Sequence, residues 1–236
     1  MRGSAQEFIA SQPTAPHEFQ FVRMIYSNYS SGYGWRRGGS WTTDAPAAET
    51  HLMQGIRRLT SIDTASEGIA LKLTDARLYE YPFLYAVEVG HWQLSDEEAA
   101  TLRDYLLRGG FLMVDDFHGT EEWAVFIESM RKVFPERPIV DLNSQEPIYH
   151  VRFDVDQRVQ IPGIRGAING QTWEKDGYIP GWRGIYDDEG RLMVSINFNM
   201  DLGDAWEHAD NPQYPVHYTI LAYQITSDYM LYAMTH

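Results

Sequence analysis

The apolar run Phe111–Val114 constrains the fold of this chain more than any other feature. It follows two glycines, contains no polar residue, and ends directly in Asp115 and Asp116, as expected of a strand that is covered on both faces. Thr120, which two glutamates follow, predicts the N-cap of a helix with an acidic first turn. A strand, a tight turn and a helix predict an α/β sheet, in which functional residues collect at the carboxyl ends of the strands.

Strands and helices alternate along the chain before Pro147, which predicts crossover connections and a largely parallel sheet. We expect strands at 19–26, 69–73, 82–89 and 111–114, and helices that begin near Asp44, Ser95 and Glu121. Later we expect antiparallel strands at 149–155 and 191–198, a hairpin turn at 181–184 and a last helix at 216–234. The predicted fold class is therefore α/β: a doubly wound, mostly parallel sheet with helices on both faces and a strand-rich C-terminal extension at about 148–210.

A single folded domain is expected over residues 18–236, because 44% of the 236 residues are hydrophobic and no internal repeat interrupts the pattern. Residues 1–17 are expected to form a leader and a flexible arm. Met1–Ser4 resembles an expression leader, and Ala5–Phe8 suits a mature start left by signal-peptide cleavage. We therefore expect an extracytoplasmic protein, periplasmic or secreted, whose signal peptide is absent from this sequence.

The composition disfavours several kinds of partner and site. The chain has 33 acidic and 19 basic residues, and its net charge of −14 repels nucleic acid and anionic membrane surfaces. No run approaches the roughly 20 apolar residues that span a bilayer. The chain has no cysteine, which excludes thiol nucleophiles, disulfides and thiolate metal sites. The expected partner is a small polar molecule or a glycan, with a partner protein as a further expectation.

Polar residues at the ends of two consecutive predicted strands form the first candidate site. Glu88 and His91 come from one strand end, and Asp115, Asp116 and His118 come from the next. If these strands are neighbours in the sheet, their carboxyl ends bring two imidazoles and three carboxylates together. Such a set suits a general base and the partner that orients it. The candidate catalytic residues are therefore His91, Asp115, Asp116 and His118.

The same residue types also suit a divalent metal ion, which is the one cofactor that the sequence indicates. The candidate ligands are His91, His118, Asp116 and the later His208. The alternative interpretation is that Asp115 and Asp116 cap backbone amides while the histidines lie at the rim of the sheet.

An acidic segment after the strand predicted at 191–198 is a second candidate site. Oxygens of Asn199, Asp201, Asp204 and Glu207 suit a cation or sugar hydroxyls, although the spacing is not that of an EF-hand. Ordinary Asx turns explain the same residue types. Aromatic and basic residues in apparent loops complete the candidate substrate-binding set: Trp35, Arg36, Trp92 and Trp206.

Two common catalytic signatures are absent from the sequence. The glycine-rich loop at 32–39 matches neither the dinucleotide fingerprint nor the P-loop, so a flexible aromatic lid, or arginines paired to the abundant acids, is the better interpretation. No Gly-x-Ser-x-Gly elbow is present, and the turn after the strand at 111–114 presents Asp116 and His118 instead. An aspartate in such a turn suits a nucleophile or a base.

Short motifs spread over most of the chain form a recognisable pattern. They are Tyr81-Pro82, Gly90-His91, Gly109-Gly110-Phe111-Leu112, Asp115-Asp116, Phe134-Pro135, Asn199-x-Asp201-Leu202-Gly203-Asp204 and the terminal Tyr232-Ala233-x-Thr235-His236. From Phe19 onward this pattern resembles a bacterial family of domains of unknown function, grouped with the class I glutamine amidotransferase-like and trehalose-utilisation-type domains. The resemblance implies a flavodoxin-like sheet, frequent export and no established activity.

Two departures limit what the resemblance implies. Amidotransferases carry a cysteine nucleophile in the turn after the strand that corresponds to 111–114, and this chain has none, so glutamine hydrolysis by that mechanism is excluded. Trehalose-utilisation-type domains are more similar, with a histidine near that turn where His118 stands. Glu146 precedes Pro147 where the family places a histidine, so no role is carried over to that loop.

The sequence thus predicts an exported amidotransferase-like domain with hydrolase-type acid/base chemistry on a carbohydrate or another polar small molecule. Two alternatives stay open. One is a non-catalytic module that binds a ligand or a partner protein through its aromatic glycine-rich loop. The other is a cation site that only stabilises the fold.

Overall fold

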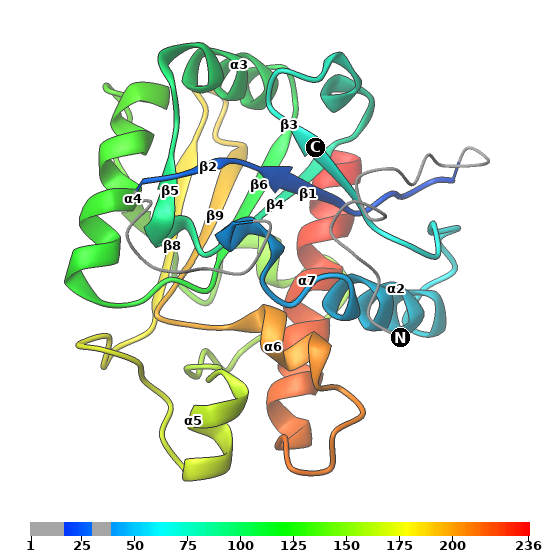
Figure 1. Ribbon diagram of the computed structural model, residues 1–236. Helices are drawn as coiled ribbons and strands as arrows, with labels where there is room; N and C mark the ends of the chain where they lie inside the picture. Colours follow the sequence, from blue (N-terminus) through cyan, green and yellow to red (C-terminus); the bar gives the residue numbers. More distant parts are fainter. Residues whose placement is uncertain (1–16, 30–38) are drawn as a thin grey trace.

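Seven strands of the described residues form one sheet in the order β3-β1-β4-β6-β9-β8-β7 (Figure 1). The computed structural model describes residues 17–29 and 39–236, so most of the predicted leader and arm, and the candidates Trp35 and Arg36, lie outside the described residues. The strands of this sheet are β1 (Val22–Ile25), β3 (Ile69–Lys72), β4 (Phe83–Val87), β6 (Phe111–Asp115), β7 (Val140–Asp141), β8 (Gly181–Tyr186) and β9 (Leu192–Phe198). A separate antiparallel pair consists of β2 (Ser27–Asn28) and β5 (Trp92–Gln93).

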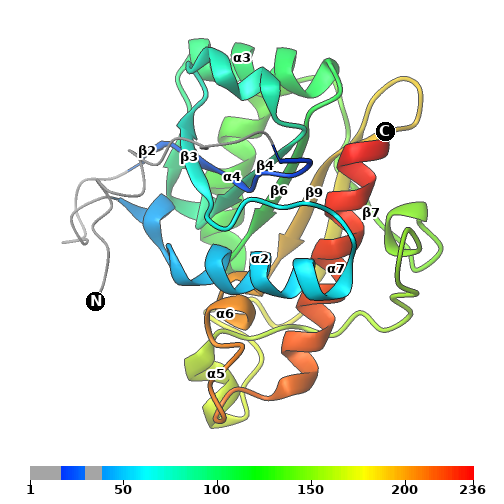
Figure 2. The ribbon, with the colours of Figure 1, turned by 90° about the vertical axis from the view of Figure 1, so that its right-hand side faces the viewer.

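Helices cover both faces of the sheet (Figure 1 and Figure 2). In β4, Phe83, Tyr85 and Val87 join the core with α2 and α7, whereas Leu84 and Ala86 join the core with α3 and α4. This alternation follows from the pleat of a strand, which points successive side chains to opposite faces. The helices of the described segments are α2 (Ala47–Leu59), α3 (Asp96–Leu107), α4 (Gly119–Val133), α5 (Ile164–Asn169), α6 (Leu202–Glu207) and α7 (Val216–Thr235). The predicted α/β class with a mostly parallel sheet is confirmed.

The C-terminal strands differ from the prediction in their pairing. β9 pairs antiparallel with β8, as expected, but it also pairs parallel with β6, so it is a central strand with both faces buried. Residues 181–184 belong to β8 rather than to a hairpin turn. Residues 149–155 form no strand, because the short helical turn η4 (Pro147–Tyr149) and bends occupy this segment. The strand-rich extension is therefore the antiparallel edge of the main sheet.

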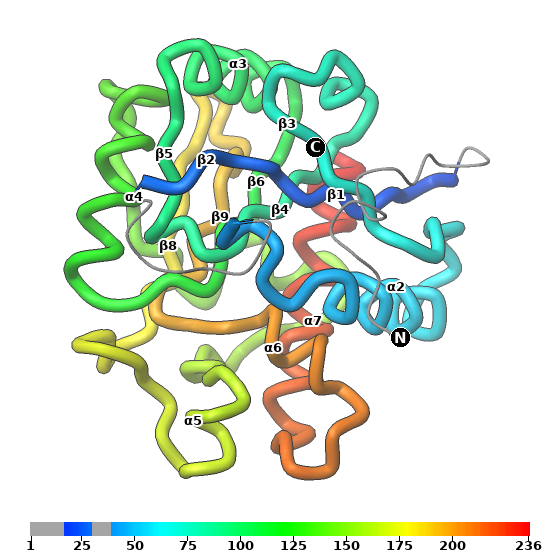
Figure 3. The backbone as a smooth tube through the Cα atoms, viewed as in Figure 1, coloured from blue at the N-terminus to red at the C-terminus, as the bar shows by residue number. Residues whose placement is uncertain are grey.

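The predicted helix starts agree with the structure at α3 but not at α4. α3 begins after Ser95, close to the predicted start, and Ser95 makes a capping box with Glu98. Thr120 is not the N-cap of α4: the helix begins at Gly119, and both the amide and the hydroxyl of Thr120 donate to Asp176, at 2.9 and 2.7 Å. α5 and α6 lie at the end of the sheet where β9 leaves it (Figure 3), and the amide of Ile164 donates to Asp204. This end of the sheet carries the residues described below.

We expect the buried carboxyl group of Asp228 in α7 to make stability depend on pH. Its Oδ1 accepts from the amides of Arg152 and Phe153, its Oδ2 has no partner, and burial raises its pKa to about 6. Because this pKa is raised in the folded state, the stabilising contribution is complete below pH 4 and is lost as the pH rises through 6. Asp228→Asn keeps an acceptor for both amides and carries no charge. The variant should match the parent near pH 4 and exceed its free energy of unfolding by about 2 kcal/mol at pH 7.

Urea unfolding at pH 4, 5, 6 and 7 measures this difference. A difference between the two proteins that stays constant over these pH values would contradict the prediction.

Candidate functional site

Three neighbouring strands end in the same unusual backbone conformation. Glu88 follows β4 with φ 55°, Asp116 follows β6 with φ 51°, and Asn199 follows β9 with φ 61°. A left-handed conformation is costly for a residue with a Cβ atom, and such strain concentrates at functional sites. Within the described residues the other non-glycine residues with positive φ are Asp44 and Lys175, and the side chains of both reach this same region. The backbone therefore marks one site at the carboxyl ends of the parallel strands.

Asp115 points inward and holds α6. Its Oδ2 accepts from the amides of Leu202 and Gly203, at 2.8 and 3.0 Å, and from the hydroxyl of Tyr85 at 3.2 Å. The side chain is fully buried, and burial together with the charge of Asp116 raises its pKa to about 8. This geometry matches the capping role that the sequence left open for Asp115, rather than contact with a ligand.

Asp116 and His118 form the central pair of the site. Oδ1 of Asp116 lies 3.1 Å from Nε2 of His118, and the two residues are 8% and 2% exposed. Burial lowers the pKa of His118, but the hydrogen bond and the charge of Asp116 outweigh it, so the pKa is raised above its ordinary value. Nδ1 of His118 is buried without a hydrogen-bond partner. The raised pKa favours a protonated imidazole at His118 beside the carboxyl group of Asp116.

The first amides of α4 are already occupied by acceptors from the protein. The amide of His118 donates to Oε2 of Glu122 at 2.5 Å, and that of Gly119 donates to Oδ1 of Asn199 at 2.9 Å. Asp176 accepts from the next amide, that of Thr120. A free helix N-terminus binds anions, and here acidic and amide side chains take those amides. The site therefore offers no anion cradle at α4.

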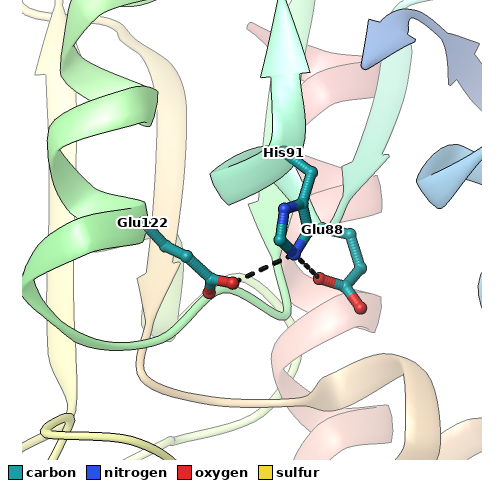
Figure 4. Close-up of side chains that lie close together, drawn as sticks. All are labelled: Glu88, His91 and Glu122. Carbon is teal, nitrogen blue, oxygen red and sulfur yellow. Dashed lines mark ion pairs between the residues drawn. The ribbon is translucent and has the colours of Figure 1, made fainter. Parts of the chain in front are cut away.

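His91 lies between two carboxylates beside this pair (Figure 4). Its Nε2 is 3.1 Å from Oε1 of Glu122 and 3.4 Å from Oε2 of Glu88, and Nζ of Lys175 pairs with the same Oε1 of Glu122. Burial opposes ionisation of Glu122, but His91 and Lys175 outweigh it and lower its pKa to about 2. Burial and the charges of Asp116 and Glu122 raise the pKa of Glu88 well above its ordinary value.

A second group of carboxylates lies on the other side of Asp116. One oxygen each of Asp44, Asp116 and Asp201 lies within 4.8 Å of the others, and Oδ2 of Asp44 is buried without a hydrogen-bond partner. A Cβ atom at Gly203 would lie 2.6 Å from that oxygen, so glycine makes room for it. Burial and mutual repulsion raise the pKa values of Asp44 and Asp201 well above the ordinary range.

The four predicted metal ligands do not share one centre. His91 joins Glu88 and Glu122, whereas Asp116 joins Asp44 and Asp201. His208 joins a third group, and its Nε2 lies 3.5 Å from Oδ1 of Asp204 and 3.8 Å from Oε2 of Glu207. His118 contacts Asp116. The structure thus divides the four predicted ligands among different groups of side chains.

Two predicted substrate-binding residues belong to the core instead. Trp92 is fully buried and stacks on Phe126 with ring centroids 5.4 Å apart. Trp206 is also fully buried and packs against Tyr85 at 5.4 Å. Asn199, a third predicted substrate-binding residue, accepts the amide of Gly119 at the start of α4 and donates to the carbonyl of Ile179. Asp201, Asp204 and Glu207 stay at the site.

Three side chains of the site were missed by the sequence analysis. A helix was expected to begin near Asp44, but α2 begins at Ala47 and the Asp44 side chain turns to the site. Glu122 lies four residues after His118, and this spacing on one face of a helix could have identified it. Lys175 comes from a loop and had no local signal.

Two surface hollows lie away from these residues. One, of about 230 Å³, is lined by apolar residues such as Trp123, Met130 and Ile185 and by Arg131 and Arg137. The other, of about 460 Å³, lies beside α7 and the segment 154–159. Neither hollow is lined by a residue of the candidate site.

Fold and site together define an α/β protein with an acid- and histidine-rich site at the carboxyl ends of a mostly parallel sheet. A family described as "Domain of unknown function (DUF4159)" matches residues 20–234, and the chain belongs to this family. No curated protein matches the chain. The absence of cysteine means that the protein is not a Cys-dependent amidotransferase. Among the helices of the described residues, none has the length and apolar character needed to cross a membrane.

The strain at Glu88 should be measurable in protein stripped of metal by EDTA. Glu88→Gly and Glu88→Ala both remove the carboxylate, but only glycine also removes the cost of the left-handed backbone. We expect the glycine variant to have the larger free energy of unfolding by about 1 kcal/mol. Chemical denaturation of the two variants side by side tests this. Equal stabilities would show that position 88 is unstrained.

Proposed function

We propose that the site catalyses hydrolase-type acid/base chemistry on a carbohydrate or another polar small molecule. The observation that carries the proposal is the pair of Asp116 and His118, which is buried and hydrogen-bonded at a strained turn between β6 and α4. Asp116 acts as the base toward a water or a hydroxyl group, and His118 is the partner that holds and returns the proton. Strain is retained at such turns where it positions a reacting group.

The surrounding acceptors favour a neutral ligand rich in hydroxyl groups. Asp44 and Asp201 present carboxyl oxygens beside Asp116, and a carboxyl group accepts hydrogen bonds in either protonation state. Sugar hydroxyls are donors that match these acceptors. Phosphates and other anions fit poorly, because the amides of α4 are occupied and the neighbours are acidic.

The resemblance of the sequence to amidotransferase-like and trehalose-utilisation-type domains adds to this proposal. In that comparison His118 stands near the turn where the latter domains have a histidine. We further propose an extracytoplasmic location, in keeping with the frequent export of the family that the motifs resemble.

A second candidate function is a glycan- or partner-binding module without catalysis. Trp173, Tyr178 and Ile179 are 38%, 64% and 76% exposed, and the rings of the first two lie 5.8 Å apart. Their loop borders the site, because Lys175 and Asp176 in the same loop contact Glu122 and Thr120. Exposed aromatic side chains at the rim of a polar site suit the flat faces of sugars.

Substitution of either member of the central pair should abolish turnover without unfolding the protein. We expect hydrolysis of at least one member of a panel of p-nitrophenyl glycosides and esters. Asp116→Asn and His118→Gln should each lower kcat by at least about 100-fold, the range of general acid–base contributions. His150→Gln is the matched control, because His150 also pairs with an aspartate, Asp154, but outside the site.

Melting temperatures and near-ultraviolet circular dichroism check the fold of each variant. Turnover that survives both substitutions, or no turnover on any member of the panel, would contradict the catalytic proposal. Stabilisation by oligosaccharides without turnover would support the binding module instead.

A further inference from the structure

The group of Glu88, His91 and Glu122 combines one imidazole with two carboxylates. One ligand atom from each lies within 4.8 Å of the other two. Figure 4 shows the Nε2 edge of the His91 ring turned toward both carboxylates, at 3.1 Å from Glu122 and 3.4 Å from Glu88. Imidazole and carboxylate donors together are typical ligands of zinc and neighbouring transition metals.

We propose that Glu88, His91 and Glu122 bind a divalent transition-metal ion of the zinc type, and that the ammonium group of Lys175 occupies the cation position when no metal is bound. Three protein ligands leave further coordination positions open to water or a ligand, as in catalytic rather than structural metal sites.

The backbone holds these ligands in place before any ion binds. The turn η3 (Val89–His91) sets Glu88 and His91 three residues apart, and Glu88 is held in the left-handed conformation. A Cβ atom at Gly90 would overlap the side chain of Glu122, so glycine at this position lets Glu122 approach. Such rigid placement on a turn and a helix suits a metal site, whose ligands must keep fixed geometry.

Glu122 is also oriented from outside the group. Its Oε2 accepts the amide of His118 at 2.5 Å, which leaves Oε1 to face His91. Metal-ligating side chains are typically held by hydrogen bonds of this kind from a second layer of residues. The same contact links the proposed metal site to the central pair of Asp116 and His118.

Lys175 contacts the ligand oxygen that the metal would need. Its Nζ pairs with Oε1 of Glu122, the atom that also faces His91. The lysine side chain is 48% exposed and that of His91 is 33% exposed, so an ion can enter from solvent and the lysine can leave toward it. The single ammonium group of Lys175 pairs with Glu122, and in the described part of the chain no ion pair joins it to Glu88. A divalent ion neutralises both carboxylates.

Metal binding by the full chain tests this inference and does not depend on the proposed acid/base function. Protein stripped with EDTA is dialysed against ZnCl2 or MnCl2 at pH 7, and bound metal is measured by inductively coupled plasma mass spectrometry, with Kd from titration calorimetry. We expect about one bound ion per chain. His91→Ala should weaken binding by more than about tenfold, the loss expected even for an outer-layer partner. Lys175→Met should tighten binding, because it removes the competing cation.

Two control variants locate the ion. His208→Ala alters the third acidic group and should leave Kd unchanged, as should His150→Gln outside the site. Absence of bound metal in both the parent and Lys175→Met overturns the inference. Binding that is insensitive to His91→Ala also overturns it, since the ion then lies elsewhere. Because no outcome uses turnover, a failure here is distinct from a failure of the catalytic proposal.

Discussion

The left-handed turns at the ends of three neighbouring parallel strands determine where the rest of the site lies. β4, β6 and β9 each pass from extended backbone to one residue of positive φ: Glu88, Asp116 or Asn199. Their parallel register aligns these ends at one edge of the sheet. Such positions mostly favour glycine. Here a glutamate, an aspartate and an asparagine occupy them, so the backbone strain remains. Strain and polar chemistry therefore concentrate at the same place.

Charge gives this site its preference among ligands. Burial and mutual repulsion raise the pKa values of several of its carboxyl groups, Glu88 and Asp201 among them, so a cation or a donor of hydrogen bonds relieves the site. The N-terminus of α4, which elsewhere would attract an anion, instead stabilises the acidic side chains of Glu122 and Asp176. The proposed metal ion supplies positive charge to these acidic side chains. The proposed hydroxyl-rich substrate supplies hydrogen-bond donors to them.

The sequence predicted the location of the site in the fold better than the residues that form it. A buried parallel strand has a local signature, so the apolar run of β6 was enough to predict where Asp116 lies. The antiparallel character of β9 was predicted, but its parallel pairing with β6 was not, because alternation along a strand does not encode its partners, which long-range packing decides. The burial of Trp92 was missed for the same reason, since it depends on its contact with Phe126. Lys175 reaches the site from a distant loop, which no local pattern predicts.

Anomalous X-ray diffraction from crystals grown with Zn²⁺ tests most directly whether the residues at the strand ends form a cation-binding site. The account predicts a single strong peak within bonding distance of Nε2 of His91 and of carboxylate oxygens of Glu88 and Glu122, with Lys175 turned away toward solvent. No peak at this position, with Lys175 still paired to Glu122, would contradict it.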